Sequence, residues 1–310
     1  MTRLLLRWVP VVLVFALPAL YLLYAPLPSA PHPEAHRYQI QQAELIRDVQ
    51  WVLPPELGVG AGIVLALHPS QSNGDRLRAI IGPSLEPWAA EQNLIVVYPD
   101  GFEGHFNDCR KAASYSARAR NVDDVAFLQQ VVKRLAEDYP VDPSRVYGVG
   151  FSNGGHMAMR LAWESPGLLR GFTAISALVP TADNLDCELA GPAPAGVALI
   201  IGTRDPISPY RGGRVTLFGF GNRGDVLSAY ASGEWFAGAL GIEAAPQPAS
   251  LPGLPVIQTD WASDQGCVRL LSIEGGGHTV PQAHYRYPRL FGATLTSDAV
   301  LQAAWQAMQC

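Results

Sequence analysis

The sequence predicts an α/β protein with a mostly parallel central sheet and helices on both faces of that sheet. Short apolar runs bounded by turn residues alternate with segments of helical periodicity. These runs are apolar at nearly every position, which is typical of strands covered on both faces. In addition, 30 glycines and 26 prolines among 310 residues supply turns between the elements.

Strand patterns and helix patterns alternate along the chain beyond residue 60. Apolar runs of four to six residues predict buried strands, and apolar residues recurring every three or four positions predict helices. Pro99 begins the turn after the second such strand, and Pro140 ends the first such helix. We expect strands at 63–67, 94–98, 146–149, 172–176, 197–201 and 268–273, and helices at 122–138, 157–163, 226–240 and 297–308.

The composition excludes two broad classes of protein. With 48% hydrophobic residues and a net charge of −5, the chain is too apolar to be intrinsically disordered. Its basic residues are scattered and form no block, and only Lys111 and Lys133 are lysines. A nucleic-acid-binding surface needs clustered positive charge. We therefore expect no nucleic-acid partner.

An apolar segment near the N-terminus predicts export. Residues 8–27 follow Arg3 and Arg7 and contain no charged residue. As a helix, 20 such residues would span about 30 Å, the thickness of a bilayer core. The preceding arginines place the remainder of the chain on the far side of the membrane. We expect a periplasmic or extracellular protein whose only contact with a membrane is through this segment.

Two interpretations of this segment compete, a cleaved signal sequence and an uncleaved anchor, and a buried N-terminal helix is the remaining alternative, which the placement of Arg3 and Arg7 disfavours. The candidate cleavage sites after Ala25 and Ala30 lack the small residue that signal peptidase requires three positions before the cut, which favours the anchor. The chain then divides into an export segment (1–27), a Pro-rich linker (28–37) and one α/β domain (38–310). The four cysteines, Cys109, Cys187, Cys267 and Cys310, fit an exported protein with up to two disulfides, whose pairing stays open.

The segment Gly150-Phe-Ser152-Asn-Gly154 matches the pattern of a nucleophile elbow. A predicted strand precedes it and a predicted helix follows it, as this motif requires. Glycines at the two ends allow the helix to cross close to the strand, and the sharp turn lifts the Ser152 hydroxyl into the open. The alternative is a glycine-rich turn in which Ser152 only caps the helix.

A serine nucleophile needs a histidine base and an acid that orients the histidine. In α/β-hydrolases the three residues occur along the chain in the order serine, acid, histidine. Asp205 follows the expected strand 197–201, and His278 follows the expected strand 268–273 on a glycine-rich loop. Each has a simpler alternative, a turn-forming aspartate and a solvated loop histidine. The competing acids are Asp225, Asp260 and Asp264, and the competing bases are His68, His105, His156 and His284.

An oxyanion hole needs two backbone donors. The Asn153 N–H lies at the start of the helix after the elbow, where the helix dipole favours negative charge. The second donor is expected in the loop after strand 63–67. Because Pro69 has no N–H, Ser70 is the expected donor there. Residues 211–225, rich in glycine, form either a flap over the site or an ordinary surface loop.

Several sequence blocks of the domain occur together in one known family. These are Leu67-His68, Tyr98-Pro-Asp-Gly101, Asn107-Asp-Cys109, Asn121-Val-Asp-Asp-Val-Ala-Phe-Leu128, Gly150-Phe-Ser-Asn-Gly-Gly155, Gly202-Thr-Arg-Asp-Pro-Ile207 with Pro209-Tyr210, and Gly276-Gly-His-Thr279. As a set they resemble the polyhydroxybutyrate depolymerase and feruloyl esterase family of secreted α/β-hydrolases. The resemblance covers nearly the whole domain from about residue 60.

The resemblance implies an α/β-hydrolase fold and a serine esterase in which Ser152 is the nucleophile, Asp205 the acid and His278 the base, with no metal or cofactor. Its implied substrates are small or oligomeric esters of the hydroxyalkanoate or feruloyl type, and the lack of a separate surface-binding domain favours these over solid polymer. Alternatives are a serine peptidase, an acyltransferase and an inactive binding protein with a hydrolase fold. Three positions where the family has other residues, Pro69, Phe106 and Val280, are expected near the substrate.

Overall fold

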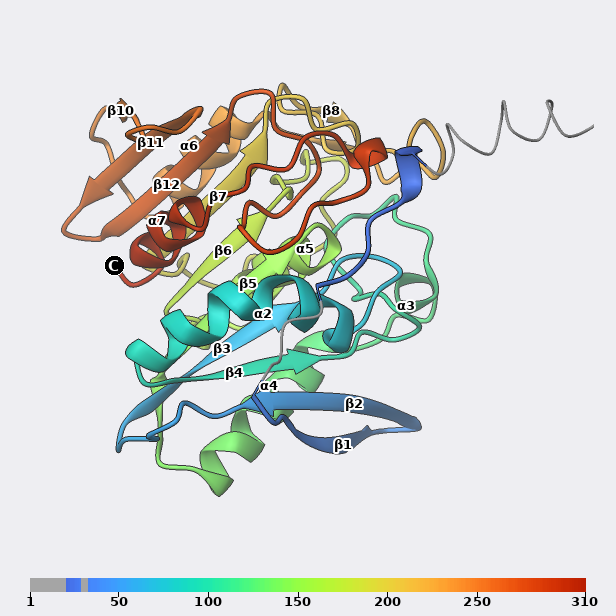
Figure 1. Cartoon of the computed structure of the whole chain (residues 1–310), viewed down its shortest axis with the longest axis vertical. Helices are drawn as coiled ribbons and strands as arrows, with labels where there is room; N and C mark the ends of the chain where they lie inside the picture. The colour runs from blue at the N-terminus through green and yellow to red at the C-terminus, as the bar shows by residue number, and fades with distance from the viewer. Residues whose placement is uncertain (1–20, 29–32) are drawn as a thin grey trace, which may run out of the picture.

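A ten-stranded sheet runs through the molecule in the order β1-β2-β4-β3-β5-β6-β7-β12-β11-β10 (Figure 1). The computed structural model describes residues 21–28 and 33–310. The pairs from β4 to β12 are parallel, whereas β1, β2, β10 and β11 join the two edges in antiparallel fashion. The strands are β1 (His36–Gln42), β2 (Leu45–Val52), β3 (Ala61–Leu67), β4 (Leu94–Pro99), β5 (Val141–Phe151), β6 (Gly171–Ile175), β7 (Gly196–Gly202), β10 (Gln247–Ser250), β11 (Val256–Ser263) and β12 (Gly266–Ile273).

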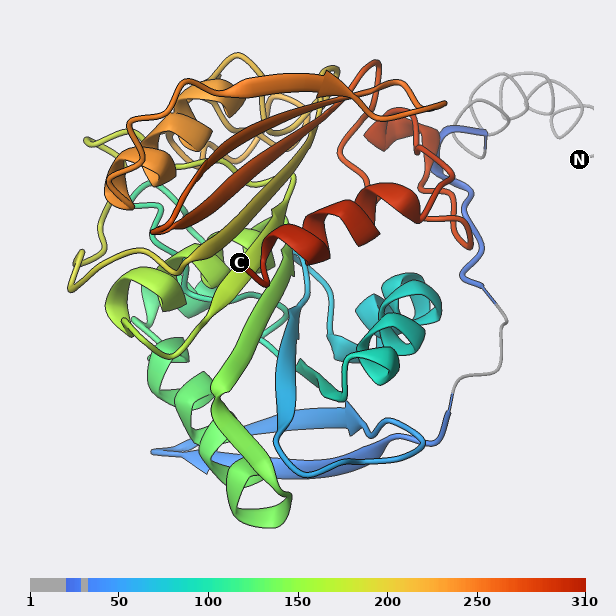
Figure 2. The same ribbon diagram turned by 90° about the vertical axis from the view of Figure 1, so that its left-hand side faces the viewer.

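Helices cover both faces of this sheet (Figure 2). Apolar residues of α2 and α7 pack on one face, and those of α4, α5 and α6 pack on the other. The residues of β3, β4, β5, β6 and β7 that pair with neighbouring parallel strands are almost completely buried. The helices are α2 (Gly74–Glu91), α3 (Ser116–Ala119), α4 (Asp124–Asp138), α5 (Asn153–Glu164), α6 (Ala229–Ala239) and α7 (Ala299–Ala307).

The predicted fold class is confirmed, and each expected strand lies within or overlaps a strand of the sheet. Three of the expected helices begin two or three residues later than predicted, at Asp124, Ala229 and Ala299, and the helix expected at 157–163 begins earlier, at Asn153. The helix expected from residue 226 starts at Ala229, because Val226 pairs with Gly213 in a short hairpin of β8 (Gly213–Arg214) and β9 (Asp225–Val226). The Ser228 side chain then accepts a hydrogen bond from the Ala231 amide and caps the helix.

Several elements were not predicted from the sequence. Helix α2 contains Pro83 and Pro87, which disfavour a helix interior, so its periodicity was not decisive. The edge strands β1, β2, β10 and β11 carry many polar residues and lack the continuous apolar runs of the central strands. Strand β1 also begins at His36, inside the linker expected at 28–37.

The N-terminal export segment expected at residues 8–27 lies largely outside the described residues. Within residues 21–28 and 33–310, no helix is both long enough and apolar enough to cross a membrane.

Two disulfides settle the cysteine pairing that the sequence left open. Cys109 bonds Cys187, which ties the loop after β4 to the loop between β6 and β7. Cys267 in β12 bonds Cys310, the last residue of the chain. Both bonds agree with the expected export to an oxidising compartment.

Candidate active site

Ser152 stands alone in the turn between β5 and α5, with φ 54° and ψ −114°. A non-glycine residue with positive φ is strained, and such strain persists where the surrounding structure enforces it. The flanking glycines permit the turn. A Cβ on Gly150 would overlap the Gly154 carbonyl, and a Cβ on Gly154 would overlap the Leu67 carbonyl of the neighbouring strand. The steric reason inferred from the sequence therefore corresponds to specific backbone contacts.

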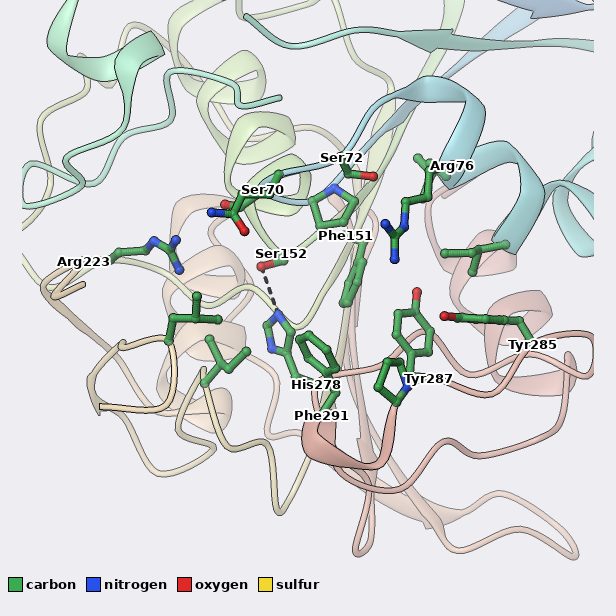
Figure 3. A pocket seen from close by; sticks show the side chains of 17 residues that line it. Ser70, Ser72, Arg76, Phe151, Ser152, Arg223, His278, Tyr285, Tyr287 and Phe291 are labelled. Carbon is green, nitrogen blue, oxygen red and sulfur yellow. Dashed lines mark hydrogen bonds between the residues drawn. The ribbon is translucent and has the colours of Figure 1, made fainter. Parts of the chain in front are cut away.

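The structure brings Ser152, Asp205 and His278 together at the carboxyl edge of the sheet. Ser152 follows β5, Asp205 follows β7 by three residues, and His278 follows β12 by five. The Nε2 atom of His278 lies 3.0 Å from Ser152 Oγ (Figure 3). Its Nδ1 atom lies 2.8 Å and 3.0 Å from the two carboxylate oxygens of Asp205. These are hydrogen-bond distances, so the three side chains form a continuous chain.

Asp205 is itself fixed in place. Its side chain is fully buried, and Oδ1 accepts hydrogen bonds of 2.8 Å from the amides of Ile207 and Ser208. These bonds hold the carboxylate toward His278. The imidazole is confined from its other side by the Phe151 ring, whose centroid lies 5.2 Å away. The acid and the base are thus oriented before any ligand is present.

The competing acids and bases lie elsewhere. Asp260 is paired with Arg269 across the β11–β12 hairpin, and Asp225 lies 3.6 Å from Arg214. Of the competing histidines, His284 faces Asp298 at 3.7 Å, and His156 is buried in α5 and does not line the cavity beside Ser152.

The expected oxyanion donors flank Ser152. Asn153 is the first residue of α5, so its amide has no acceptor within the helix. Ser70 lines the same cavity as Ser152, and its amide donates to no protein group in the described part of the chain. Both amides are therefore free to donate to a ligand atom beside Ser152.

Buried His68 orients the peptide that carries the Ser70 amide. Its Nδ1 donates to the Pro69 carbonyl at 2.8 Å, and its Nε2 accepts from the Gly101 amide at 2.8 Å. Burial lowers the pKa of His68 to about 4, so the ring is neutral at pH 7 and one nitrogen is free to accept. In a trans peptide the N–H points opposite to the carbonyl, so fixing the Pro69 oxygen also fixes the direction of the Ser70 N–H.

A buried polar network holds the residue after the serine, and no pattern in the sequence indicates it. The Asn153 side chain accepts from the Phe106 amide at 2.8 Å, and its Nδ2 donates to the Phe106 carbonyl at 2.9 Å and to Asp108 at 2.6 Å. Arg110 forms an ion pair with the same Asp108 carboxylate, with Nη2 2.6 Å from Oδ2. Burial opposes ionisation of Asp108, but the charge and hydrogen bonds of Arg110 keep its pKa below the usual value.

The serine opens into a cavity of about 240 Å³ (Figure 3). This volume is close to the lower end for small-molecule sites. Aromatic rings of Phe151, Tyr285, Tyr287 and Phe291 form much of its wall. The glycine-rich segment expected as a flap or a surface loop contributes to the same wall, through Leu217 and Arg223.

Of the three positions expected near the substrate, only Pro69 lines the cavity. The other two expectations are wrong for a simple packing reason. Phe106 is fully buried and packs against the His68 ring, with 4.6 Å between centroids. Val280 is fully buried in the core beneath α2 and α7.

Comparisons with known sequences show similarity to esterases. The family described as Phospholipase/Carboxylesterase matches residues 110–217, which include Ser152 and Asp205. A putative esterase, NocK, from Nocardia uniformis subsp. tsuyamanensis is 29% identical over 260 residues, which are 77% of this chain and 72% of the relative. A probable feruloyl esterase C from Aspergillus flavus is 26% identical over 227 residues, 71% of each protein. The expected resemblance to feruloyl esterases is confirmed.

A solved structure with a similar fold is the acetyl xylan esterase from Aspergillus awamori. It covers 80% of this chain and 95% of its own, with a TM-score of 0.57 and 17% identity. A second, an S-formylglutathione hydrolase from Agrobacterium tumefaciens, has a TM-score of 0.50 and 15% identity. At such identities the likeness concerns the fold.

Proposed function

We propose that this chain, which has the α/β-hydrolase fold, hydrolyses small or oligomeric carboxylic esters through an acyl-enzyme. The observation that carries the proposal is the continuous hydrogen-bonded chain from Ser152 through His278 to Asp205. Its esterase relatives support the same reaction class. The small cavity favours a small ester over an extended polymer segment.

The first half of the reaction acylates the serine. His278 Nε2 takes the proton of the Ser152 hydroxyl while Oγ attacks the ester carbonyl carbon. The carbonyl oxygen becomes an oxyanion, which accepts hydrogen bonds from the amides of Asn153 and Ser70. When this intermediate collapses, the bond to the alcohol oxygen breaks, and His278 gives its proton to the departing alcohol.

The second half releases the acid. Water enters, His278 takes one of its protons, and the resulting hydroxide attacks the acyl carbon. Collapse of the second intermediate frees the carboxylic acid and returns the proton to Ser152 Oγ. Throughout, Asp205 accepts from His278 Nδ1, which holds the imidazole in one tautomer and stabilises its protonated form.

The direct test is hydrolysis of p-nitrophenyl acetate and butyrate by the purified chain, with Ser152→Ala as the control. We expect an initial burst of p-nitrophenol and steady turnover by the wild type and neither by the variant. Equal rates for the two proteins would overturn the proposal. Labelling by a fluorophosphonate probe, lost in Ser152→Ala, tests the nucleophile independently of the substrate. A chain that labels but transfers its acyl group only to an added alcohol is an acyltransferase, and one that cleaves only amides is a peptidase.

We further propose that residues 1–27 export the chain, that 28–37 form a linker and that the catalytic domain spans 38–310. The two disulfides support an oxidising destination. The N-terminal sequence of the mature protein separates the two forms of export. A new terminus near residue 26 or 31 would establish a cleaved signal, whereas an intact terminus in the membrane fraction would establish an anchor.

A further inference from the structure

The cavity beside Ser152 carries positive charge. Among residues 21–28 and 33–310, two arginines, Arg76 and Arg223, line it, and no aspartate or glutamate does. This contrasts with the chain as a whole, whose net charge is −5. A concave site lined by one sign of charge attracts ligands of the opposite sign. The two arginines lie on opposite sides of Ser152 (Figure 3).

The half-buried Arg223 has no carboxylate of its own. Among the described residues its guanidinium forms no ion pair, and it lies 6.0 Å from the centre of the Tyr115 ring. Asp108, whose negative charge acts on Arg223, already accepts from Arg110, Tyr115 and Asn153. Burial and the charge of Arg110 lower the pKa of Arg223. A positive charge held in a partly dry site without a counter-ion is costly unless a ligand supplies one.

Hydrogen bonds hold the backbone of Arg223 in place, which fixes the position of its Cα atom relative to the cavity. The Arg223 amide donates to the Val215 carbonyl at 3.0 Å, and its carbonyl accepts from Asn184 Nδ2 at 3.1 Å. Arg76 differs, because it is exposed on the first turns of α2 and solvent screens its charge. The guanidinium of Arg223 is therefore the stronger candidate for a direct contact.

We propose that the ester substrate carries a carboxylate and that Arg223 binds it. A planar guanidinium pairs with a carboxylate through two parallel hydrogen bonds, which fixes orientation as well as charge. Arg76, on the other side of Ser152, adds to the positive potential at the entrance. This proposal rests on the proposed ester hydrolysis and names the class of ester: one whose acyl or alcohol part ends in a free acid group.

Two pairs of esters test the proposal, and the members of each pair differ in one group, a carboxylate or a neutral group. Mono-4-nitrophenyl adipate has the carboxylate on its acyl part, where 4-nitrophenyl hexanoate has a methyl group. 3-Butyryloxybenzoate has the carboxylate on its alcohol part, where 3-butyryloxybenzamide has a neutral amide. We expect the anionic member of at least one pair to have a kcat/KM about tenfold or more above its neutral partner at low salt. That preference should shrink as salt is added.

Variants then assign the preference to Arg223. We expect Arg223→Gln to bring the ratio of anionic to neutral kcat/KM close to one, and Arg223→Lys to retain part of it. Arg214→Gln is the matched control, because Arg214 belongs to the same hairpin, is exposed and does not line the cavity. This control should keep the wild-type ratio.

The possible outcomes distinguish a failure of the carboxylate proposal from a failure of the proposed ester hydrolysis. Should the wild type cleave neutral esters as well as or better than anionic ones, the carboxylate proposal fails and ester hydrolysis stands. A preference that survives in Arg223→Gln but disappears in Arg76→Gln would overturn the assignment to Arg223. Cleavage of none of the four esters would count against the proposed function itself. The wild-type comparison does not depend on whether any variant folds.

Discussion

Asn153 Nδ2 lies 2.6 Å from Asp108 Oδ2, and both residues are completely buried. This contact joins the residue after the nucleophile to a loop some 45 residues earlier in the chain. Because Asn153 also supplies an expected oxyanion donor through its backbone, the same bond that anchors its side chain fixes the direction of its N–H. Asn153 thus has a positioning role in addition to its backbone role.

Replacing Asn153 by alanine should therefore impair turnover more than binding. The substitution removes four hydrogen bonds and leaves the buried Phe106 amide without its partner, which costs about 1–3 kcal/mol of stability. We expect kcat for p-nitrophenyl butyrate to fall about tenfold with little change in KM. Asn107→Ala is the matched control, since Asn107 is equally buried but bonds the Val122 carbonyl. Equal losses of kcat in both variants would contradict the positioning role.

Asp205→Asn should leave the fold intact and nearly abolish catalysis. An amide at this position is able to donate to His278 Nδ1 and so favours the tautomer that cannot take the serine proton. We expect kcat to fall by about 10,000-fold, with a midpoint of thermal unfolding close to that of the wild type. Asp225→Asn, outside the hydrogen-bonded chain, should retain activity. A fully active Asp205→Asn enzyme would show that another carboxylate serves as the acid.

Gly154→Ala should destabilise the elbow strongly. The added Cβ would meet the Leu67 carbonyl, which is backbone in a central strand and has little freedom to move. We expect a loss of at least about 3 kcal/mol in urea unfolding, or failure to fold. The control is Gly238→Ala near the end of α6, where nothing lies within 4 Å of the new carbon. That variant should be unchanged or up to about 1 kcal/mol more stable.

The neutral His68 predicts a loss of stability in mild acid. Its pKa is about 4 in the folded protein and near 6.5 in an unfolded chain, so between these values the unfolded state binds more protons. Stability is therefore full above pH 6.5 and falls as the pH drops toward 4, by at most about 3 kcal/mol from this group. Below pH 4 both states are protonated and no further loss arises from it.

Urea unfolding at pH 7, 5.5 and 4 measures this effect. His68→Asn keeps a donor near the Pro69 carbonyl but no longer titrates. We expect it to be less stable than the wild type at pH 7 and the gap to narrow toward pH 4. Parallel pH curves for the two proteins would show that the His68 ring is not the group responsible.

Much of the site followed from local sequence. The elbow from Gly150 to Gly154 is recognisable because a strained turn between strand and helix admits few residue types. Asp205 and His278 were identified because each follows an apolar run of strand length, and the carboxyl ends of parallel strands meet at one edge. These inferences needed only short-range pattern and the known order of acid and base.

The remainder depended on contacts between distant segments. Periodicity does not show that Asp108 supports Asn153 or that Cys109 pairs with Cys187, since each contact joins residues 45 or more positions apart. Nor does it show that Arg223 lines the cavity, because that depends on how its loop folds back over the site. Helix α2 formed despite two prolines because its apolar side packs on the sheet. The sequence by itself determined the fold class and the choice of proposed reacting groups, because both are encoded in local patterns. Only the tertiary structure decided what surrounds those groups, because burial and charge pairing arise when the chain packs.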